Sequence, residues 1–198
     1  MNPSFYEKYE CQCYPRDMEI PSEYQHCRFS NFKAQGFSDR IEPLVQAVES
    51  TGWGVLLGKR TGNGKSHLGV SSLIRSWASD RFAPEYGIER NPQCSKYRFY
   101  NARRLGVNLE TAGLDFTEML DEVLNHRGIL LDEFGRAMSD KARDRLEILI
   151  DECHSQRVQL IITAGMNPQE FNQCLDGSIL RRINDHAVFV HCDWTRQG

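Results

Sequence analysis

A run of small, polar and basic residues, Gly58 to His67, reads GKRTGNGKSH and has the residue types of a phosphate-binding loop. Small residues allow consecutive backbone N–H groups to turn inward around phosphates, and the start of the following helix adds partial positive charge. Lys65 would place a full charge beside the β and γ phosphates of a nucleotide, and the Ser66 hydroxyl would ligate Mg²⁺. The residues expected to contact the nucleotide are Thr61, Gly62, Asn63, Gly64, Lys65, Ser66 and His67.

The entrance to this loop departs from the usual spacing. In the pattern G-x-x-x-x-G-K-[ST] the first glycine would fall at position 59, which is a lysine, and the nearest glycine is Gly58. Lys59 is therefore either a tolerated substitution or the sign of a loop that is longer by one residue. The competing interpretation is that residues 62–66 form only a turn before a helix.

A second group of residues with chemical potential is a pair of acids, Asp132 and Glu133, that follows the apolar run 129–131. Ligands of open parallel sheets bind at the carboxyl ends of the strands, so these acids would lie at the same edge as the loop. Asp132 would hold Mg²⁺ through water, and Glu133 would orient and deprotonate an attacking water. The alternative is a pair of ordinary carboxylates that cap the next turn. The loop and the acids together predict an ATP site with Mg²⁺ and an ATPase activity.

The elements that must position these residues alternate between strands and helices. Strands are predicted where short apolar runs occur, at residues 55–57, 97–100, 128–131, 158–163 and 187–190. Helices are predicted from near Lys65, after Ser139 as N-cap, and after Asn167, where Pro168 and Glu170 complete a capping box. Strands separated by helices predict an α/β three-layer sandwich with a central, largely parallel sheet.

Composition excludes several classes of protein. The chain has 198 residues, 40% of them hydrophobic, with a net charge of −3 and seven cysteines. No apolar run approaches the roughly 20 residues of a membrane span, and the N-terminus lacks the pattern of a secretory signal. The odd number of cysteines then indicates reduced thiols, so a cytoplasmic protein with no membrane partner is expected. Because the net charge is negative, any contact with nucleic acid must come from a local basic patch.

Around these motifs the sequence resembles the AAA+ ATPases of the bacterial helicase-loader family, the DnaC/DnaI group, and the related IstB-type transposition helpers. The resemblance covers residues 20–195 and rests on IPSEY (20–24), FSNF (29–32), GNGKSHL (62–68), LLDEFG (130–135) and SILRRI (178–183). It implies a P-loop NTPase core of the AAA+ and ASCE type over residues 29–198. A short irregular N-terminal arm over residues 1–28 would precede this core, and no C-terminal helical lid domain would follow it.

The resemblance also implies roles for residues outside the two nucleotide motifs. Phe29 and Phe32 would lie beside the adenine, although both side chains also suit a core. Arg182, with Arg181 as the adjacent alternative, would reach the γ-phosphate bound by a neighbouring subunit. That role implies self-association and hydrolysis only in an assembly. The alternative is that both arginines are solvated charges on a helix surface.

One further departure from the family bears on the rate of hydrolysis. Helicase loaders usually place a polar residue, often asparagine, after the fourth strand, to sense the γ-phosphate. Here that position reads Thr163-Ala164-Gly165, and the asparagine comes later as Asn167. Either Thr163 substitutes for the sensing residue or sensing is weakened. Together with Lys59, this predicts slow turnover.

The N-terminal arm and its junction with the core hold four potential zinc ligands: Cys11, Cys13, His26 and Cys27. Zinc sites mostly use C-x₂₋₄-C pairs, and C-x-C is tighter. Zinc is therefore not expected, and buried thiols or the remnant of a lost zinc module are favoured.

Basic and aromatic residues interleave at 96–100 and are followed by Arg103 and Arg104. This combination suits single-stranded DNA, because bases stack on rings and the phosphates meet the charges, and both arginines become candidate DNA contacts. The same alternation is also that of a half-buried strand.

Three functions remain in competition. The first is an ATP-dependent helicase loader that binds a hexameric replicative DNA helicase and assists its placement on single-stranded DNA, as an ATP/ADP switch. The second is a transposition helper ATPase that acts on duplex DNA with a transposase. The third is a nucleotide-stabilised interaction module with little hydrolysis. Glu133 argues against the third function, whereas Gly165 argues mildly for it.

Overall fold

A parallel sheet forms the centre of the fold. The computed structural model describes residues 10, 13–32, 38–50, 52–83, 88–89 and 94–194. Its main sheet has five strands in the order β4-β5-β6-β1-β7, all parallel. The strands are β1 (Trp53–Leu57), β4 (Tyr97–Asn101), β5 (Gly128–Phe134), β6 (Gln159–Ala164) and β7 (Ala187–His191). All of the strands predicted from the sequence are therefore present, and they form the predicted parallel sheet.

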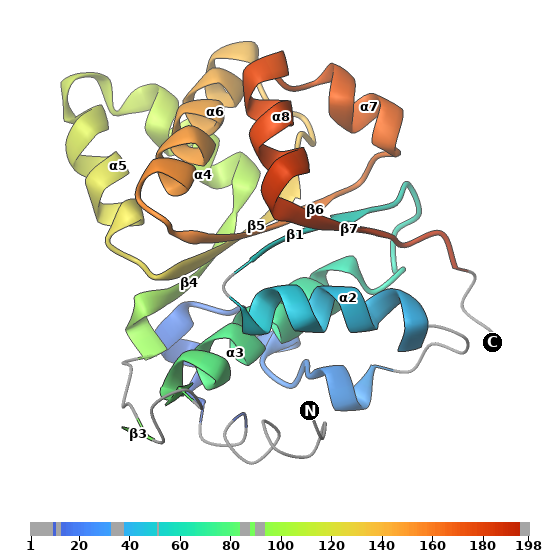
Figure 1. The fold of residues 1–198 in the computed structure, drawn as a ribbon. Helices are drawn as coiled ribbons and strands as arrows, with labels where there is room; N and C mark the ends of the chain where they lie inside the picture. Colours follow the sequence, from blue (N-terminus) through green and yellow to red (C-terminus); the bar gives the residue numbers. More distant parts are fainter. Residues whose placement is uncertain are drawn as a thin grey trace.

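Helices cover both faces of this sheet, as Figure 1 shows. On one face lie α2 (Ser38–Glu49) and α3 (Lys65–Arg81). On the other face lie α4 (Ala102–Thr111), α5 (Phe116–Leu124), α6 (Asp140–Ser155), α7 (Pro168–Gln173) and α8 (Gly177–His186). The predicted three-layer α/β sandwich is thus confirmed. In the part of the chain that the structure describes, no helix follows β7, and no helix is long and apolar enough to cross a membrane.

The strands bury both of their faces. Leu56, Leu130 and Ile161 belong to the core beneath α3, whereas their neighbours Leu57 and Leu131 belong to the core on the opposite face. Successive side chains of a strand point to opposite faces, so a strand between two helical layers must be apolar at consecutive positions. This explains the continuous apolar runs of the sequence.

Local capping signals set the start of several helices. α3 begins at Lys65, as predicted. The Ser139 hydroxyl accepts a hydrogen bond from the Ala142 N–H at the start of α6. Asn167 and Glu170 form the predicted capping box of α7, in which each side chain accepts a hydrogen bond from the backbone N–H of the other residue. These caps satisfy N–H groups that the helix itself leaves unpaired.

The remaining elements are short. They are the 3-10 turns η1 (Pro15–Met18), η2 (Ser22–Tyr24), η3 (Phe29–Asn31), η4 (Cys94–Lys96) and η5 (Gly113–Asp115), and an antiparallel pair, β2 (Phe82–Ala83) with β3 (Ile88–Glu89). Met18, Ile20 and Cys27 are buried in the same core as α3. The segment 13–32 therefore packs against the helix that follows the glycine loop. The division into residues 1–28 and 29–198 stays a prediction.

Candidate active site

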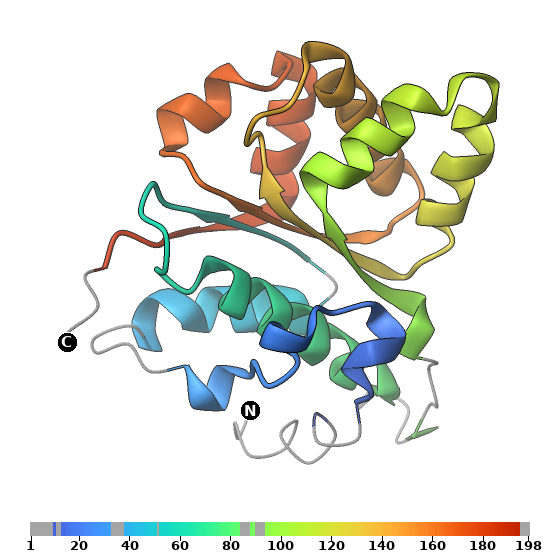
Figure 2. The ribbon, with the colours of Figure 1, turned by 180° about the vertical axis from the view of Figure 1, so that it is seen from behind.

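The loop between β1 and α3, visible in Figure 2, has a backbone that requires glycine at two positions. Gly62 and Gly64 have φ angles of 78° and 77°, in the left-handed region that strains other residues. At Gly64 an added Cβ would also overlap the ring of Phe32. Both glycines therefore have a positive φ, and Gly64 also takes a position of close approach.

The entrance to the loop explains the displaced glycine. A Cβ at Gly58 would lie 2.7 Å from the carbonyl oxygen of Cys192, on the segment that follows β7. Close packing therefore needs a glycine at position 58. The Lys59 side chain is exposed and its Nζ lies 2.6 Å from Glu170 Oε1 on α7. Lys59 is thus directed toward α7.

Lys65 lies across the loop and close to both acids. Its Nζ donates a hydrogen bond to the carbonyl oxygen of Arg60, at 2.8 Å. Partial burial lowers its pKa, and the charges of Asp132 and Glu133 act in the opposite direction. The loop lysine and the two acids after the apolar run are therefore brought together, as the two motifs require.

Asp132 is buried at the end of β5 in a network of hydrogen bonds. Only 4% of the residue is exposed, and Thr163 Oγ1 donates a hydrogen bond to its Oδ1 at 2.6 Å. Burial raises the pKa of Asp132, while hydrogen bonding by Thr163 and Ser66 opposes that rise. The predicted metal ligands Ser66 and Asp132 therefore lie within contact of one another. A hydroxyl beside a carboxylate offers the oxygen donors that Mg²⁺ prefers, so these residues fit the ion.

Glu133 has an unusual backbone. Its φ angle is 60°, although it is not a glycine, and the pairing of β5 with β6 shifts register between Leu131 and Phe134. Such a conformation costs of order 1–3 kcal/mol and persists only where surrounding contacts maintain it. Here the Glu133 N–H donates to Thr163 Oγ1 at 3.1 Å. The bulge at Glu133 therefore interrupts the alternation of side chains between the two faces of the sheet at the two acids.

The Glu133 carboxylate is held by two donors. Arg136 Nη1 donates to Oε1 at 2.7 Å, and Asn101 Nδ2 donates to Oε2 at 3.4 Å. Asn101 ends β4 and also caps α4, because its Oδ1 accepts the N–H of Arg104. Glu133 thus lies at the carboxyl edge of the sheet with a partner from the neighbouring strand.

The two predicted adenine-side aromatics occupy different places. Phe32 packs on Gly64, with its ring centroid 5.2 Å from that of His67 and 5.9 Å from that of Trp194. Phe29 instead lies beneath the guanidinium of Arg75, at 5.5 Å, against the core of α3. The structure therefore places Phe32 against the loop glycine, and both rings pack against the core of α3.

The end of the described chain also borders the loop. The Asn63 side chain donates to the carbonyl oxygen of Cys192, and Trp194 Nε1 donates to the carbonyl oxygen of Asn63 at 2.7 Å. Tyr24 approaches from the N-terminal side, where hydrogen bonding with Ser66 opposes the burial that raises its pKa. The loop is therefore contacted from both ends of the described chain.

The candidate arginines lie on α4 and α8, which cover the face of the sheet opposite α2 and α3. Arg182 on α8 forms an ion pair with Asp151 on α6 and is half-buried, whereas Arg181 is exposed. Arg103 and Arg104 are exposed in the first turn of α4, directly after Asn101.

Of the three aromatic residues before α4, two are buried and Tyr100 is partly buried. Tyr97 and Phe99 are 3% and 8% exposed and belong to the core beneath α3. The alternation at 96–100 is therefore that of a half-buried strand, and Tyr97 and Phe99 are not available for stacking on bases.

Several site residues were missed from the sequence. Asn101 follows a predicted strand at its carboxyl end, the same signal that identified the acids, and could have been found. Thr163, the candidate sensor of the γ-phosphate, has a hydroxyl that bonds both Asp132 and the Glu133 N–H. Tyr24 and Trp194 carry no local signal, because their approach to the loop depends on tertiary packing.

The sheet order, the glycine loop and the paired acids define a P-loop nucleoside triphosphatase fold. No protein-family model matches the sequence, and no curated protein matches it. Among solved structures, the DnaC helicase loader is similar with a TM-score of 0.65 and 18% identity, covering 86% of this chain and 99% of that chain. DnaI gives a TM-score of 0.64 and 17% identity, covering 88% and 95%.

The replication initiator DnaA, bound to AMPPCP and single-stranded DNA, has a TM-score of 0.63 and 14% identity, covering 89% of this chain and 51% of that chain. These likenesses confirm the expected fold: the chain has an AAA+ fold of the DnaC type.

Proposed function

We propose that this protein is an ATP-dependent helicase loader, which binds a replicative DNA helicase and helps to place it on single-stranded DNA. The observation that carries the ATPase part is the meeting of Lys65, Ser66 and Asp132 at one edge of the sheet. The loader part rests on the likeness to DnaC and DnaI, which extends over nearly the whole of each of those chains.

Nucleotide would bind through the loop and its flanking aromatics. The N–H groups of residues 61–67 and the Lys65 ammonium would hold the phosphates, since both present positive charge at a helix start. Ser66 and Asp132 would hold Mg²⁺, which neutralises phosphate charge. Phe32, together with Trp194, offers the apolar surface nearest the loop for the base.

Hydrolysis would use Glu133 as the base. As the water oxygen bonds to the γ-phosphorus, Glu133 takes a proton from that water, and the bond to the bridging oxygen breaks to leave ADP. The ion pair with Arg136 occupies Oε1 of Glu133, so Arg136 would compete with the attacking water for this carboxylate. This supports slow turnover and a long-lived ATP state, as a switch requires.

A neighbouring subunit and DNA would both act at this site. Arg182 would leave Asp151 and reach the γ-phosphate of a neighbouring subunit in a self-assembly. Arg103 and Arg104 would contact the DNA backbone beside the acids, because α4 begins next to Asn101, a partner of Glu133.

The test is affinity capture from native lysate with the Glu133→Gln variant, in ATP and again in ADP. A hexameric helicase retained in ATP, released in ADP and absent with Lys65→Ala would support the proposal. Retention of a transposase, or of duplex DNA alone, would refute helicase loading while leaving the ATPase. Unchanged ATP affinity in Lys65→Ala would refute the nucleotide site itself.

A further inference from the structure

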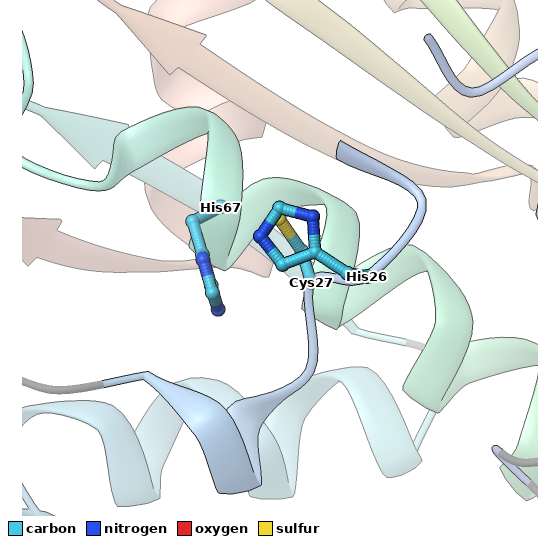
Figure 3. A group of neighbouring side chains, drawn as sticks. All are labelled: His26, Cys27 and His67. Atoms are coloured by element: carbon cyan, nitrogen blue, oxygen red, sulfur yellow. The ribbon is translucent and has the colours of Figure 1, made fainter. Parts of the chain in front are cut away.

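Three metal-ligating side chains meet beside the phosphate loop, from segments that are far apart in the sequence. His26 and Cys27 lie between η2 and η3, and His67 lies in the first turn of α3. One potential ligand atom of each lies within 4.8 Å of those of the other two. Figure 3 shows the three side chains next to one another, with the Cys27 thiol behind the His26 imidazole. We propose that the His26–Cys27–His67 group binds a zinc ion.

The hydrogen bond of the His67 ring leaves its Nδ1 available for a metal. His67 Nε2 lies 3.0 Å from the carbonyl oxygen of Arg28. A carbonyl can only accept, so Nε2 carries the proton and Nδ1 keeps its lone pair. Imidazoles that ligate metals usually donate their other N–H to such a carbonyl or to a carboxylate, which fixes the tautomer and the ring orientation.

The backbone of the other two ligands is also held in place. The Cys27 N–H donates to Tyr24 O at 2.9 Å, and the Cys27 carbonyl accepts Arg28 Nη1 at 2.7 Å. The His26 carbonyl accepts Asn31 Nδ2 at 2.7 Å. Two ligands on adjacent, anchored residues lose little freedom when they bind an ion. The 3-10 turns around them therefore serve to preorganise the donors.

The protonation states suit a cation that displaces a proton. Burial raises the pKa of the Cys27 thiol to about 11, so the thiol is protonated at neutral pH until a metal binds. Burial lowers the pKa of His67, which favours the neutral imidazole that coordinates. Binding would release the Cys27 proton, and one thiolate with two neutral imidazoles would leave a single positive charge on the filled site.

The donor set selects the class of metal. Nitrogen and sulfur ligands suit zinc, whereas the Ser66–Asp132 pair offers oxygen ligands for magnesium. Bond lengths of about 2.1 and 2.3 Å put tetrahedral donors roughly 3.3–3.6 Å apart. The present spacing must therefore close by about 1 Å, and His26, which is exposed, is able to rotate. Three protein ligands leave a fourth position open to water or a partner.

The site differs from the zinc set considered from the sequence. Cys13 is buried with its Sγ 3.9 Å from Met18 Sδ, and Cys11 lies outside the described residues. His67 takes their place, and it directly follows Ser66. A zinc ion here would tie segment 13–32 to the first turn of α3.

The test uses Co²⁺, which takes zinc sites and is coloured. The full chain is reduced, freed of metal and titrated with Co²⁺, and the thiolate-to-cobalt absorption band is followed. We expect one equivalent to bind, with displacement by Zn²⁺ and release of one proton. His26→Ala and His67→Ala should each weaken Co²⁺ binding at least tenfold, as loss of a ligand requires. Because His26 is exposed, its variant should keep the unfolding midpoint of the wild type.

Matched controls separate this site from other thiols and imidazoles. A Cys11→Ser, Cys13→Ser double variant and His126→Ala, whose imidazole bonds Val123 O away from this group, should keep the band. Absence of a thiolate band in the wild type would overturn the proposal. So would unchanged Co²⁺ affinity in His67→Ala, or loss of the band in the double variant. The readout does not depend on ATP hydrolysis, so the proposed function and the zinc site can fail separately.

Discussion

The hydroxyl of Thr163 should determine both the stability of the site and its use of metal. It donates to Asp132 Oδ1 and accepts the Glu133 N–H, in a place where the residue is 1% exposed. Thr163→Val keeps the branched shape and removes both hydrogen bonds. Leaving a buried donor or acceptor unpaired costs about 1–3 kcal/mol for each group. We therefore expect the free energy of unfolding to fall by about 2–6 kcal/mol.

Thr163→Ser is the matched control. Serine keeps the hydroxyl and loses only Cγ2, which lies 2.9 Å from the position of an added Cβ at Gly69. Loss of one buried methyl group costs about 1 kcal/mol. Serine should therefore retain Mg²⁺-dependent ATP binding, whereas valine should lose much of it, because Asp132 and Glu133 are no longer fixed.

The difference between these variants should depend on pH. The hydrogen bond from Thr163 lowers the pKa of Asp132 against the effect of burial, so it stabilises the charged carboxylate. Its contribution is therefore present at neutral pH and is lost as pH falls through the folded-state pKa. Urea unfolding at several pH values, with ATP titration in Mg²⁺, measures both effects. A valine variant as stable as the serine variant, or a gap that does not shrink in acid, would refute this reasoning.

Three further outcomes are expected. Asp132→Asn should unfold at a higher urea concentration than the wild type at neutral pH, because burial raises the pKa of the carboxyl and its ionisation therefore lowers the stability of the fold. This gain should vanish below the ordinary pKa of 3.8, and equal urea midpoints at pH 7 would contradict it. Arg182→Ala should slow turnover roughly 10³-fold, and mixing it with Glu133→Gln should restore part of the rate if the arginine acts between subunits; a mixture as inactive as its components would exclude that role. Gly62→Ala should lower the free energy of unfolding by about 1–2 kcal/mol, because its φ is left-handed. Gly64→Ala should lower it further and weaken ATP binding, since only the Cβ added at Gly64 meets Phe32. Calorimetric ATP titrations that give the same affinity for both variants would contradict the role of Phe32.

Local patterns in the sequence were sufficient for the strands of the main sheet and for the starts of α3, α6 and α7, whereas α2, α4, α5 and α8 were not predicted. The apolar runs marked the strands, and the caps at Ser139 and Asn167 marked helix starts, because these signals act within one or two turns of chain. The run 129–131 also located the two acids. The prediction ended this strand at Leu131, whereas β5 continues to Phe134, because the bulge at Glu133 lets pairing with β6 resume.

Contacts between distant segments could not be predicted in this way. Phe29 and Phe32 are alike in type and three positions apart, and only the placement of Arg75 over one ring and of Gly64 against the other separates their surroundings. The partnership of His26 with His67 likewise depends on how segment 13–32 packs on α3. One sequence carries no periodic signal for such pairs.

The hydrogen bond from Trp194 to Asn63 places a fluorescent side chain beside the glycine loop. Of the three tryptophans, Trp53 and Trp77 are buried within the two cores, at 5% and 1% exposure. Trp194 alone is partly exposed and bonded to the loop. Its indole emission senses local polarity, so nucleotide occupancy can be followed by intrinsic fluorescence without a dye. Trp194→Phe keeps the two buried tryptophans and supplies their background emission.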